Sequence, residues 1–143
     1  NMNHPGSSLG YKIKVNGVFI CYFTDNEIEP PYKKEINFDD FLRFQIRTGT
    51  ILEATPNTKA RHPAYILKID FGPLGIKTSS AQITKNYQPG NLTGMQISAV
   101  INFPIKRVAG VNSEVLVLGA YSEEKGVVLL KPTDSVEDGS LVG

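Results

Sequence analysis

Residues 65–81 read YILKIDFGPLGIKTSSA, and this stretch decides the fold class of the chain. Apolar and polar residues alternate over 65–71, which is the two-residue period of a strand with one buried face. The segment 72–75, GPLG, has the composition of a turn, and a further strand follows over 76–81. The stretch therefore predicts two consecutive strands joined by a turn, the repeating unit of an all-β protein.

Further strand patterns lie on both sides of this stretch, at 45–54, 95–103, 115–118 and 127–130. Gly49 falls inside the first of them, where a glycine often marks a bulge or a barrel corner. Short helices are predicted at 38–41 and at 83–87, the second ended by Pro89 and Gly90. Five or six short strands, with a small helix between the third and the fourth, predict a partly open, five-stranded barrel of the OB type.

The first 35 residues are predicted to form an extension of their own. Residues 9–15 alternate, Asn16 and Gly17 are typical of a type I′ turn, and residues 18–23 form an apolar return strand, so we expect a β-hairpin. The segment 29–35, EPPYKKE, cannot continue a strand or a helix because of its two prolines. We therefore expect a hairpin extension and proline-rich linker over 1–35 and the barrel domain over 36–143.

Composition excludes several classes of protein. The chain has 143 residues, of which 41% are hydrophobic and 20% charged, so it can build a core. No apolar run approaches the roughly 20 residues of a membrane span, and no signal peptide is recognised, so we expect a cytoplasmic protein. The single cysteine, Cys21, excludes a disulfide framework and a cysteine-cluster zinc site. Ser79 and Ser80 lack the G-x-S-x-G elbow of a nucleophile, and we expect no catalytic residue, metal or cofactor.

The charges are unevenly distributed along the chain. Residues 43–107 carry nine Lys and Arg against two acidic residues, whereas residues 108–143 carry two basic and six acidic residues. If the fold keeps the two groups apart, a basic surface is available to an anionic partner such as RNA. The alternative is that the two signs interleave in space and cancel.

The strongest candidate for such a contact is the pair Lys106 and Arg107, which follow Asn102 and Phe103. The cations can neutralise phosphate, and the amide of Asn102 can read a base edge. Phe103 could stack on a base, but its parity with Ile97 in the predicted strand favours a position in the core.

Two further cations are candidates for the same groove. Arg47 is predicted to point outward from the first strand, and Lys77 from the third, opposite Ile76. Each is equally typical of a solvent-facing strand position. His62 has no second histidine or cysteine near it in the sequence, so a loop position is favoured over a metal site.

A family resemblance rests on six segments that follow one another in order. The chain from residue 44 to residue 143 resembles CsaA-type proteins, the secretion-chaperone branch of the EMAP-II-like tRNA-binding domains. The segments are QIRTGTI (45–51), RHPAY (61–65), IKTSSAQIT (76–84), VINFP (100–104), RVAG (107–110) and SEVLVLG (113–119). The SSAQIT string favours this branch over the related domain appended to methionyl-tRNA synthetases, which stays the alternative.

The resemblance implies an OB fold that dimerises through segments flanking the barrel and binds tRNA without catalysis. The branch is also associated with unfolded or exported polypeptides. Ser113 and Glu114 match a Ser-Glu pair of the family and are expected to contact tRNA, although the same residues are typical of a turn. The segment implied to lie near the dimer contact comprises Ser79, Ser80, Ala81 and Ile83.

The front segment resembles a different family. Residues 3–6 (NHPG), 9–11 (LGY) and 22–27 (YFTDNE) resemble a piece of a metallo-β-lactamase-fold hydrolase, in which His4 and Asp25 would match metal ligands. The chain lacks the His-x-His-x-Asp-His cluster of that family, so a working dinuclear site is not expected. The segment is therefore interpreted as a remnant of a fused hydrolase, with a chance hairpin as the alternative.

Overall fold

The computed structural model describes residues 9–15, 18–24 and 35–143, the first two segments by their backbone alone. The chain divides into two compact units between Phe38 and Asp39. In the first unit, β1 (Leu9–Val15) pairs antiparallel with β2 (Val18–Thr24), which confirms the predicted hairpin. Its turn residues, Asn16 and Gly17, lie outside the described residues, as do His4 and Asp25.

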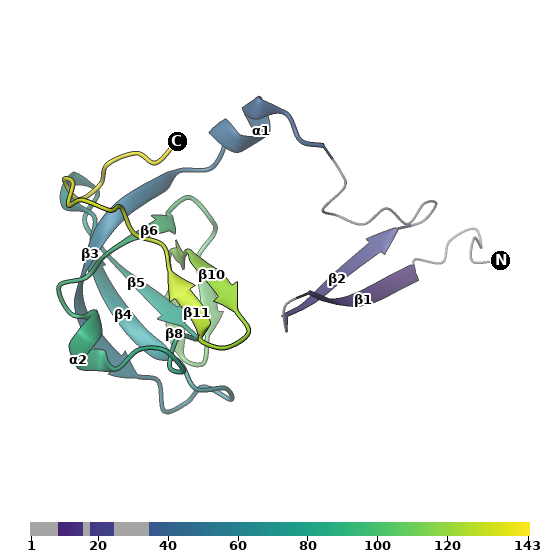
Figure 1. Ribbon diagram of the computed structural model, residues 1–143, viewed down its shortest axis with the longest axis horizontal. Helices are drawn as coiled ribbons and strands as arrows, with labels where there is room; N and C mark the ends of the chain where they lie inside the picture. Colours follow the sequence, from purple (N-terminus) through teal and green to yellow (C-terminus); the bar gives the residue numbers. More distant parts are fainter. Residues whose placement is uncertain (1–8, 16–17, 25–34) are drawn as a thin grey trace. The chain divides into compact units, whose positions relative to one another are not determined.

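The second unit is an antiparallel, nearly closed OB-type barrel, as the sequence predicts (Figure 1). Its sheet has the order β5-β4-β3-β6-β9. The strands are β3 (Ile46–Pro56), β4 (Tyr65–Asp70), β5 (Ile76–Ala81), β6 (Gln96–Val100) and β9 (Leu116–Val117). Strands β4 and β5 are joined by the short 3-10 turn η2 (Gly72–Leu74), where the sequence places a turn.

The alternation of β4 supplies much of the core. Tyr65, Leu67 and Ile69 face inward and are buried, and Phe71 continues the same face into the turn. They pack with residues of the other strands, among them Ile51 and Ile97. Burying one such side chain contributes about 1.5–3 kcal/mol, so this face of β4 is a main source of the stability of the barrel.

The long strand β3 pairs with two neighbouring strands. Its first half pairs with β6 and its second half with β4, with a register shift between Ile51 and Glu53. The bulge thus falls after Gly49 rather than on it. A glycine is needed at position 49 for close packing, because a Cβ there would lie 2.8 Å from the side chains of Ile69 and Phe71.

The barrel closes where β5 meets the segment that precedes β9. The Glu114 amide donates to the Thr78 carbonyl over 2.8 Å, and the Thr78 amide donates back to Glu114 Oε2 over 2.7 Å. The Ser79 hydroxyl donates to the Val115 carbonyl (3.0 Å), and the Ser80 amide donates to Ser113 Oγ (3.2 Å). Side chains therefore replace part of the backbone ladder at this seam.

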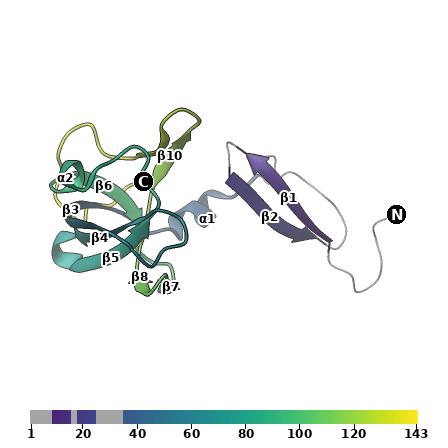
Figure 2. The same ribbon diagram turned by 90° about the horizontal axis from the view of Figure 1, so that it is seen from below.

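Two hairpins project from opposite sides of the barrel (Figure 2). One joins β7 (Lys106–Val108) to β8 (Val111–Ser113), and the other joins β10 (Gly119–Ser122) to β11 (Gly126–Leu129). The sequence analysis missed β7, β8 and β10. The two turn residues of the first hairpin, Ala109 (φ 46°) and Gly110 (φ 81°), have the positive φ values of a type I′ turn.

The predicted helices are partly displaced. The first, α1 (Phe38–Leu42), lies where it was expected. The second does not form over 83–87, where only a single turn is closed by hydrogen bonds to the Ile83 carbonyl. Instead α2 (Pro89–Leu92) begins at the proline that was expected to end the helix, because proline has no amide hydrogen to lose in the first turn of a helix.

Strand β6 is shorter than predicted, ending at Val100 rather than at residue 103. The Asn102 side chain accepts from the Gln45 amide (2.9 Å) and donates to the Arg43 carbonyl (2.8 Å). These bonds replace the ladder, and the residues that follow leave the sheet. The parity argument for Phe103 therefore fails, and its side chain is 44% exposed rather than in the core.

The C-terminal segment runs back along the free edge of β3 (Figure 1). Thr48 makes two backbone hydrogen bonds with this segment: its amide donates to the Ser140 carbonyl, and its carbonyl accepts from the Gly139 amide. Thr50 Oγ1 donates to Asp138 Oδ1 over 2.7 Å. The edge of β3 is thereby covered, which removes a site for pairing with other chains. Among the described residues, no helix is long and apolar enough to cross a membrane.

Candidate nucleic-acid interface

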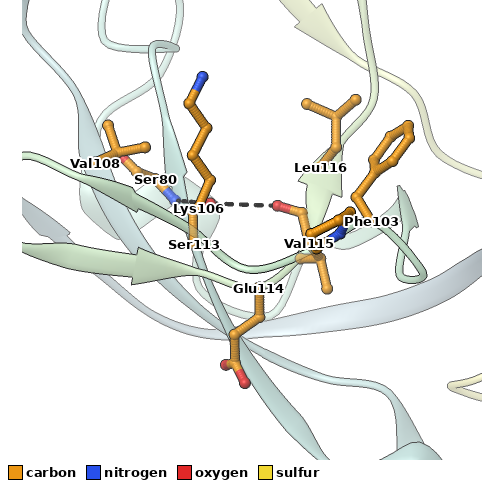
Figure 3. A pocket seen from close by; sticks show the side chains of 9 residues that line it. Ser80, Phe103, Lys106, Val108, Ser113, Glu114, Val115 and Leu116 are labelled. Atoms are coloured by element: carbon orange, nitrogen blue, oxygen red, sulfur yellow. Dashed lines mark hydrogen bonds between the residues drawn. The ribbon is translucent and has the colours of Figure 1, made fainter.

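Two neighbouring cavities lie between the β7–β8 hairpin and the barrel wall. The first, of about 310 Å³, is lined mainly by apolar side chains, with Lys106, Ser113 and Glu114 also in its wall (Figure 3). The second, of about 410 Å³, is lined by residues of the β3–β4 loop and of β7. Ser80 and Val108 line both cavities, so the two are adjacent. We call them the apolar cavity and the basic cavity.

An exposed aromatic ring borders the apolar cavity. Phe103 lies against Phe44 in an edge-to-face arrangement, with ring centroids 6.0 Å apart and an interplanar angle of 82°. This geometry is a favourable one for aromatic pairs, and it holds the Phe103 ring beside the cavity while leaving part of it accessible. Val108, Val115 and Leu116 also line this cavity.

The basic cavity is lined by Lys59, Arg61 and His62, and no acidic residue lines it. Its loop is tied to the β7–β8 hairpin by the buried Asn57, whose Nδ2 donates to the Ala109 carbonyl (3.4 Å) and whose Oδ1 accepts from the Lys59 amide (3.1 Å). The loop is therefore held against the hairpin, which places the three basic side chains beside the apolar cavity.

The predicted tRNA-binding residues fall into two groups. Lys106, Ser113 and Glu114 line the apolar cavity. In Figure 3, the Lys106 amine extends to one side of the backbone and the Glu114 carboxylate to the other. Arg107 is the neighbour of Lys106 in β7 and is exposed, with Nη1 donating to Asn112 Oδ1 over 3.3 Å.

Like Arg107, three other predicted tRNA-binding residues line neither cavity. Asn102 anchors the end of β6, as described above. Arg47 is half-buried and donates to the Gly139 carbonyl (3.1 Å) and to Gln45 Oε1 (2.9 Å), so its guanidinium holds the C-terminal segment. Lys77 is half-buried on β5, opposite Ile69 of β4. These positions remain predictions as RNA contacts.

The predicted dimer-contact residues differ in how far their side chains are buried. Ser79 is 1% exposed and Ile83 is 3% exposed, so both side chains are packed inside the barrel. Ser80 and Ala81 are half-buried and keep part of their surface accessible.

The sequence analysis did not select Lys59 and Arg61 as site residues. Both belong to a loop without strand or helix periodicity, and long-range contacts such as that of Asn57 with Ala109 bring the loop to the hairpin. The one available signal was the resemblance itself, because Arg61 and His62 lie in one of its segments. Within residues 35–143, no group of three or more His, Cys, Asp or Glu side chains is placed to hold a metal ion.

An OB-type barrel with an apolar cavity beside a basic one defines a class of protein that binds oligomeric ligands across one face of the barrel. Comparison with known proteins agrees. Residues 46–141 match the family model described as "Putative tRNA binding domain", and the chain belongs to this family.

Solved structures narrow the relationship to the CsaA branch. The chaperone CsaA of Bacillus anthracis is 53% identical, with a TM-score of 0.73 over 77% of this chain and 100% of that one. CsaA of Picrophilus torridus is 47% identical, with a TM-score of 0.72 over 76% of this chain and 100% of that one. The chain therefore belongs to the CsaA family, as its SSAQIT string indicates.

Methionine–tRNA ligases are more distant relatives. That of Porphyromonas gingivalis is 35% identical over 112 residues, which are 78% of this chain and 16% of the ligase. The chain thus spans about one sixth of the length of these relatives. A structure of a MetRS-related protein from Pyrococcus horikoshii is 25% identical, with a TM-score of 0.69 over 77% of this chain and 99% of that one.

Proposed function

We propose that this protein is a non-catalytic, cytoplasmic RNA-binding protein that holds tRNA or another structured RNA at the two adjacent cavities. The observation that carries the proposal is that a cavity lined by Lys59 and Arg61 lies next to a cavity lined by Lys106 and the exposed Phe103 ring. Cations beside an exposed aromatic ring are the combination with which OB barrels bind a phosphate backbone and its bases. Membership of the tRNA-binding-domain family supports tRNA as the RNA.

The test is the salt dependence of tRNA binding. Each phosphate that the protein neutralises releases counterions, so raising salt from about 50 to 200 mM weakens binding at least about tenfold if several phosphates are contacted. The double variant Lys106→Gln, Arg107→Gln is expected to lower affinity and to flatten the salt response. Lys125→Gln, at the exposed turn of the β10–β11 hairpin, is the matched control and should match the wild type. A flat salt response of the wild type would remove the proposal.

A second candidate function is the binding of unfolded or exported polypeptides. It is favoured by the apolar walls of the first cavity and by exposed apolar residues next to it, Leu116 on β9 and Ile105 before β7. Alternate side chains of an extended peptide fit such pockets. The word chaperone in the names of the two CsaA structures points the same way.

Competition separates the two candidates. If an unfolded cationic preprotein peptide displaces labelled tRNA mole for mole, the two ligands share the surface. If tRNA binds at micromolar concentration and no peptide binds, the chaperone function is lost and the RNA function stands.

We further propose that the protein is a homodimer. Exposed apolar side chains gather on the segments that flank β3, with Leu42 and Phe44 before it and Leu141 on the C-terminal segment that pairs with Arg47. Such residues are typical of an interface. Light scattering is expected to give twice the monomer mass of 15.7 kDa, and a monomer at tens of micromolar would contradict the proposal.

A further inference from the structure

The two adjacent cavities differ in chemistry, and the difference assigns a separate part of one nucleotide to each. We infer that, within the RNA interface proposed above, they form a subsite for a single unpaired nucleotide, with the nucleobase in the apolar cavity and a flanking phosphate in the basic cavity. The inference rests on the proposed RNA function, and it adds that the protein recognises an unpaired residue rather than a continuous duplex.

The apolar cavity suits a flat, weakly solvated group. Its volume of about 310 Å³ lies at the lower end of the range for ligand pockets, so it accepts something smaller than most whole ligands. Val108, Val115 and Leu116 offer a phosphate no partner, and Lys106 is the one cation in this cavity's wall, against Lys59 and Arg61 in the basic cavity. A charge is disfavoured where apolar side chains surround it. A nucleobase can bury its faces against these side chains and against the Phe103 ring.

The charged side chains of the two cavities determine which cavity takes the phosphate and which takes the base. Glu114 belongs to the wall of the apolar cavity, and its carboxylate repels a phosphate from that side. The basic cavity contains Lys59, Arg61 and His62 and no acid. Among the described residues, the recorded ion pair joins Lys68 to Glu53 and involves neither Lys59 nor Arg61. Their charge is therefore available to a phosphate.

Polar groups at the junction fit the sugar or a base edge. Ser80 lines both cavities, and its amide is bonded to Ser113 Oγ, which fixes the Ser113 hydroxyl at the wall (Figure 3). Lys106 also lines the apolar cavity, and its amine extends away from the Glu114 carboxylate. A base inside a duplex is covered by its pairing partner and stacked neighbours, so only an unpaired base can enter a hollow of this size.

The test compares one RNA strand, alone and paired. A labelled strand of about twelve nucleotides, within the span of an OB-fold site, is titrated onto the full chain alone and after annealing to its complement. Phe103→Ala is expected to weaken binding of the single strand at least about fivefold without changing its salt dependence, because stacking involves no counterion release. The same variant should leave binding of the duplex unchanged. Tyr121→Ala removes an exposed aromatic residue from β10 and serves as the control.

Arg61→Gln tests the phosphate half. On the single strand it is expected to make the slope of log affinity against log salt less negative by about 0.7, the contribution of one phosphate contact. Lys125→Gln should leave the slope unchanged. If Phe103→Ala does not fold, Phe103→Leu replaces it, since leucine keeps the apolar surface but has no ring face to stack.

Three results would overturn the inference while tRNA binding by the wild type persists. In the first, Phe103→Ala binds the single strand with the affinity of the wild type. In the second, Phe103→Ala weakens binding of the duplex as much as binding of the single strand. In the third, an apolar peptide displaces the strand and binds the protein tenfold more tightly than the strand does. If the wild type binds neither tRNA nor the single strand, the RNA function itself fails and the subsite fails with it.

Discussion

At the scale of single residues, Gly49 shows why a strand position can exclude every side chain. A Cβ at this position would lie 2.8 Å from Ile69 Cγ2 and from two ring carbons of Phe71. Both neighbours are fully buried and have nowhere to move. The sequence indicates that Gly49 is special, but not the reason, because the neighbours come from a strand twenty residues away.

Gly49→Ala is therefore expected to destabilise the barrel by about 1–3 kcal/mol, the usual cost of overpacking a core. The measurement is the midpoint of chemical unfolding at an unchanged slope. Gly90→Ala is the control, since a Cβ there meets nothing within 4 Å and alanine is the better helix former in α2. Equal stability of the two variants would contradict the packing argument.

Single residues also explain why the sequence analysis did not find the β7–β8 hairpin and placed Phe103 wrongly. The β7–β8 hairpin turns through Ala109 and Gly110, and alanine in place of asparagine removes the usual signal of a type I′ turn. Phe103 was expected in the core because its parity was counted through residues 101–103, which do not belong to the strand. Both errors arise where long-range contacts override a local pattern.

At the scale of elements, the C-terminal segment acts as a strap on β3. Asp138 Oδ1 accepts from Thr50 Oγ1 (2.7 Å) and from Gln96 Nε2 (3.0 Å), which ties the segment to two strands at once. Neither the strap nor its partners could be predicted, because 136–142 has no strand periodicity and its bonds run to side chains on β3 and β6 as well as to the backbone.

Asp138→Ala is expected to lower the free energy of unfolding by about 1–2 kcal/mol, somewhat below the usual worth of two bonds to a charged acceptor because the site is partly exposed. Thermal unfolding followed by circular dichroism measures the loss. Asp134→Ala, an exposed acid in the same part of the chain, should change the melting temperature little. If both variants melt alike, Asp138 does not hold the strap.

Strand β4 and its connection to β5 show why some elements could be predicted. Strand β4 carries its own alternation, and the segment that joins it to β5 has the composition of a turn, so local sequence suffices there. The missed strands β7, β8 and β10 are three to four residues long, which is too short for a period to be recognised. The prediction of the site was affected most, because residues of two of these short strands, β7 and β8, line the cavities.

At the scale of the whole molecule, the barrel unit beginning at Asp39 contains its own core. The CsaA structure from Bacillus anthracis is matched over its full length by 77% of this chain, so that protein folds with nothing equivalent to the remaining part. The domain boundary at 35/36 stays a prediction.

Removal of residues 1–35 is therefore expected to leave the melting temperature of the barrel and its tRNA affinity unchanged within error. Calorimetry and a binding titration on the shortened chain provide the comparison with the full chain. A loss of several degrees, or of binding, would mean that the front segment supports the barrel.

The seam of the barrel has a consequence for how the protein responds to a ligand. Ser80, Ser113 and Glu114 both fasten β5 to the segment before β9 and line the apolar cavity. A ligand that fills the apolar cavity binds only the form in which these hydrogen bonds are intact. Its presence therefore makes local opening of the seam less frequent by mass action. Deuterium uptake at the amides of Thr78 and Ser80 should slow on ligand addition, while uptake at the distant β10–β11 hairpin keeps its pace.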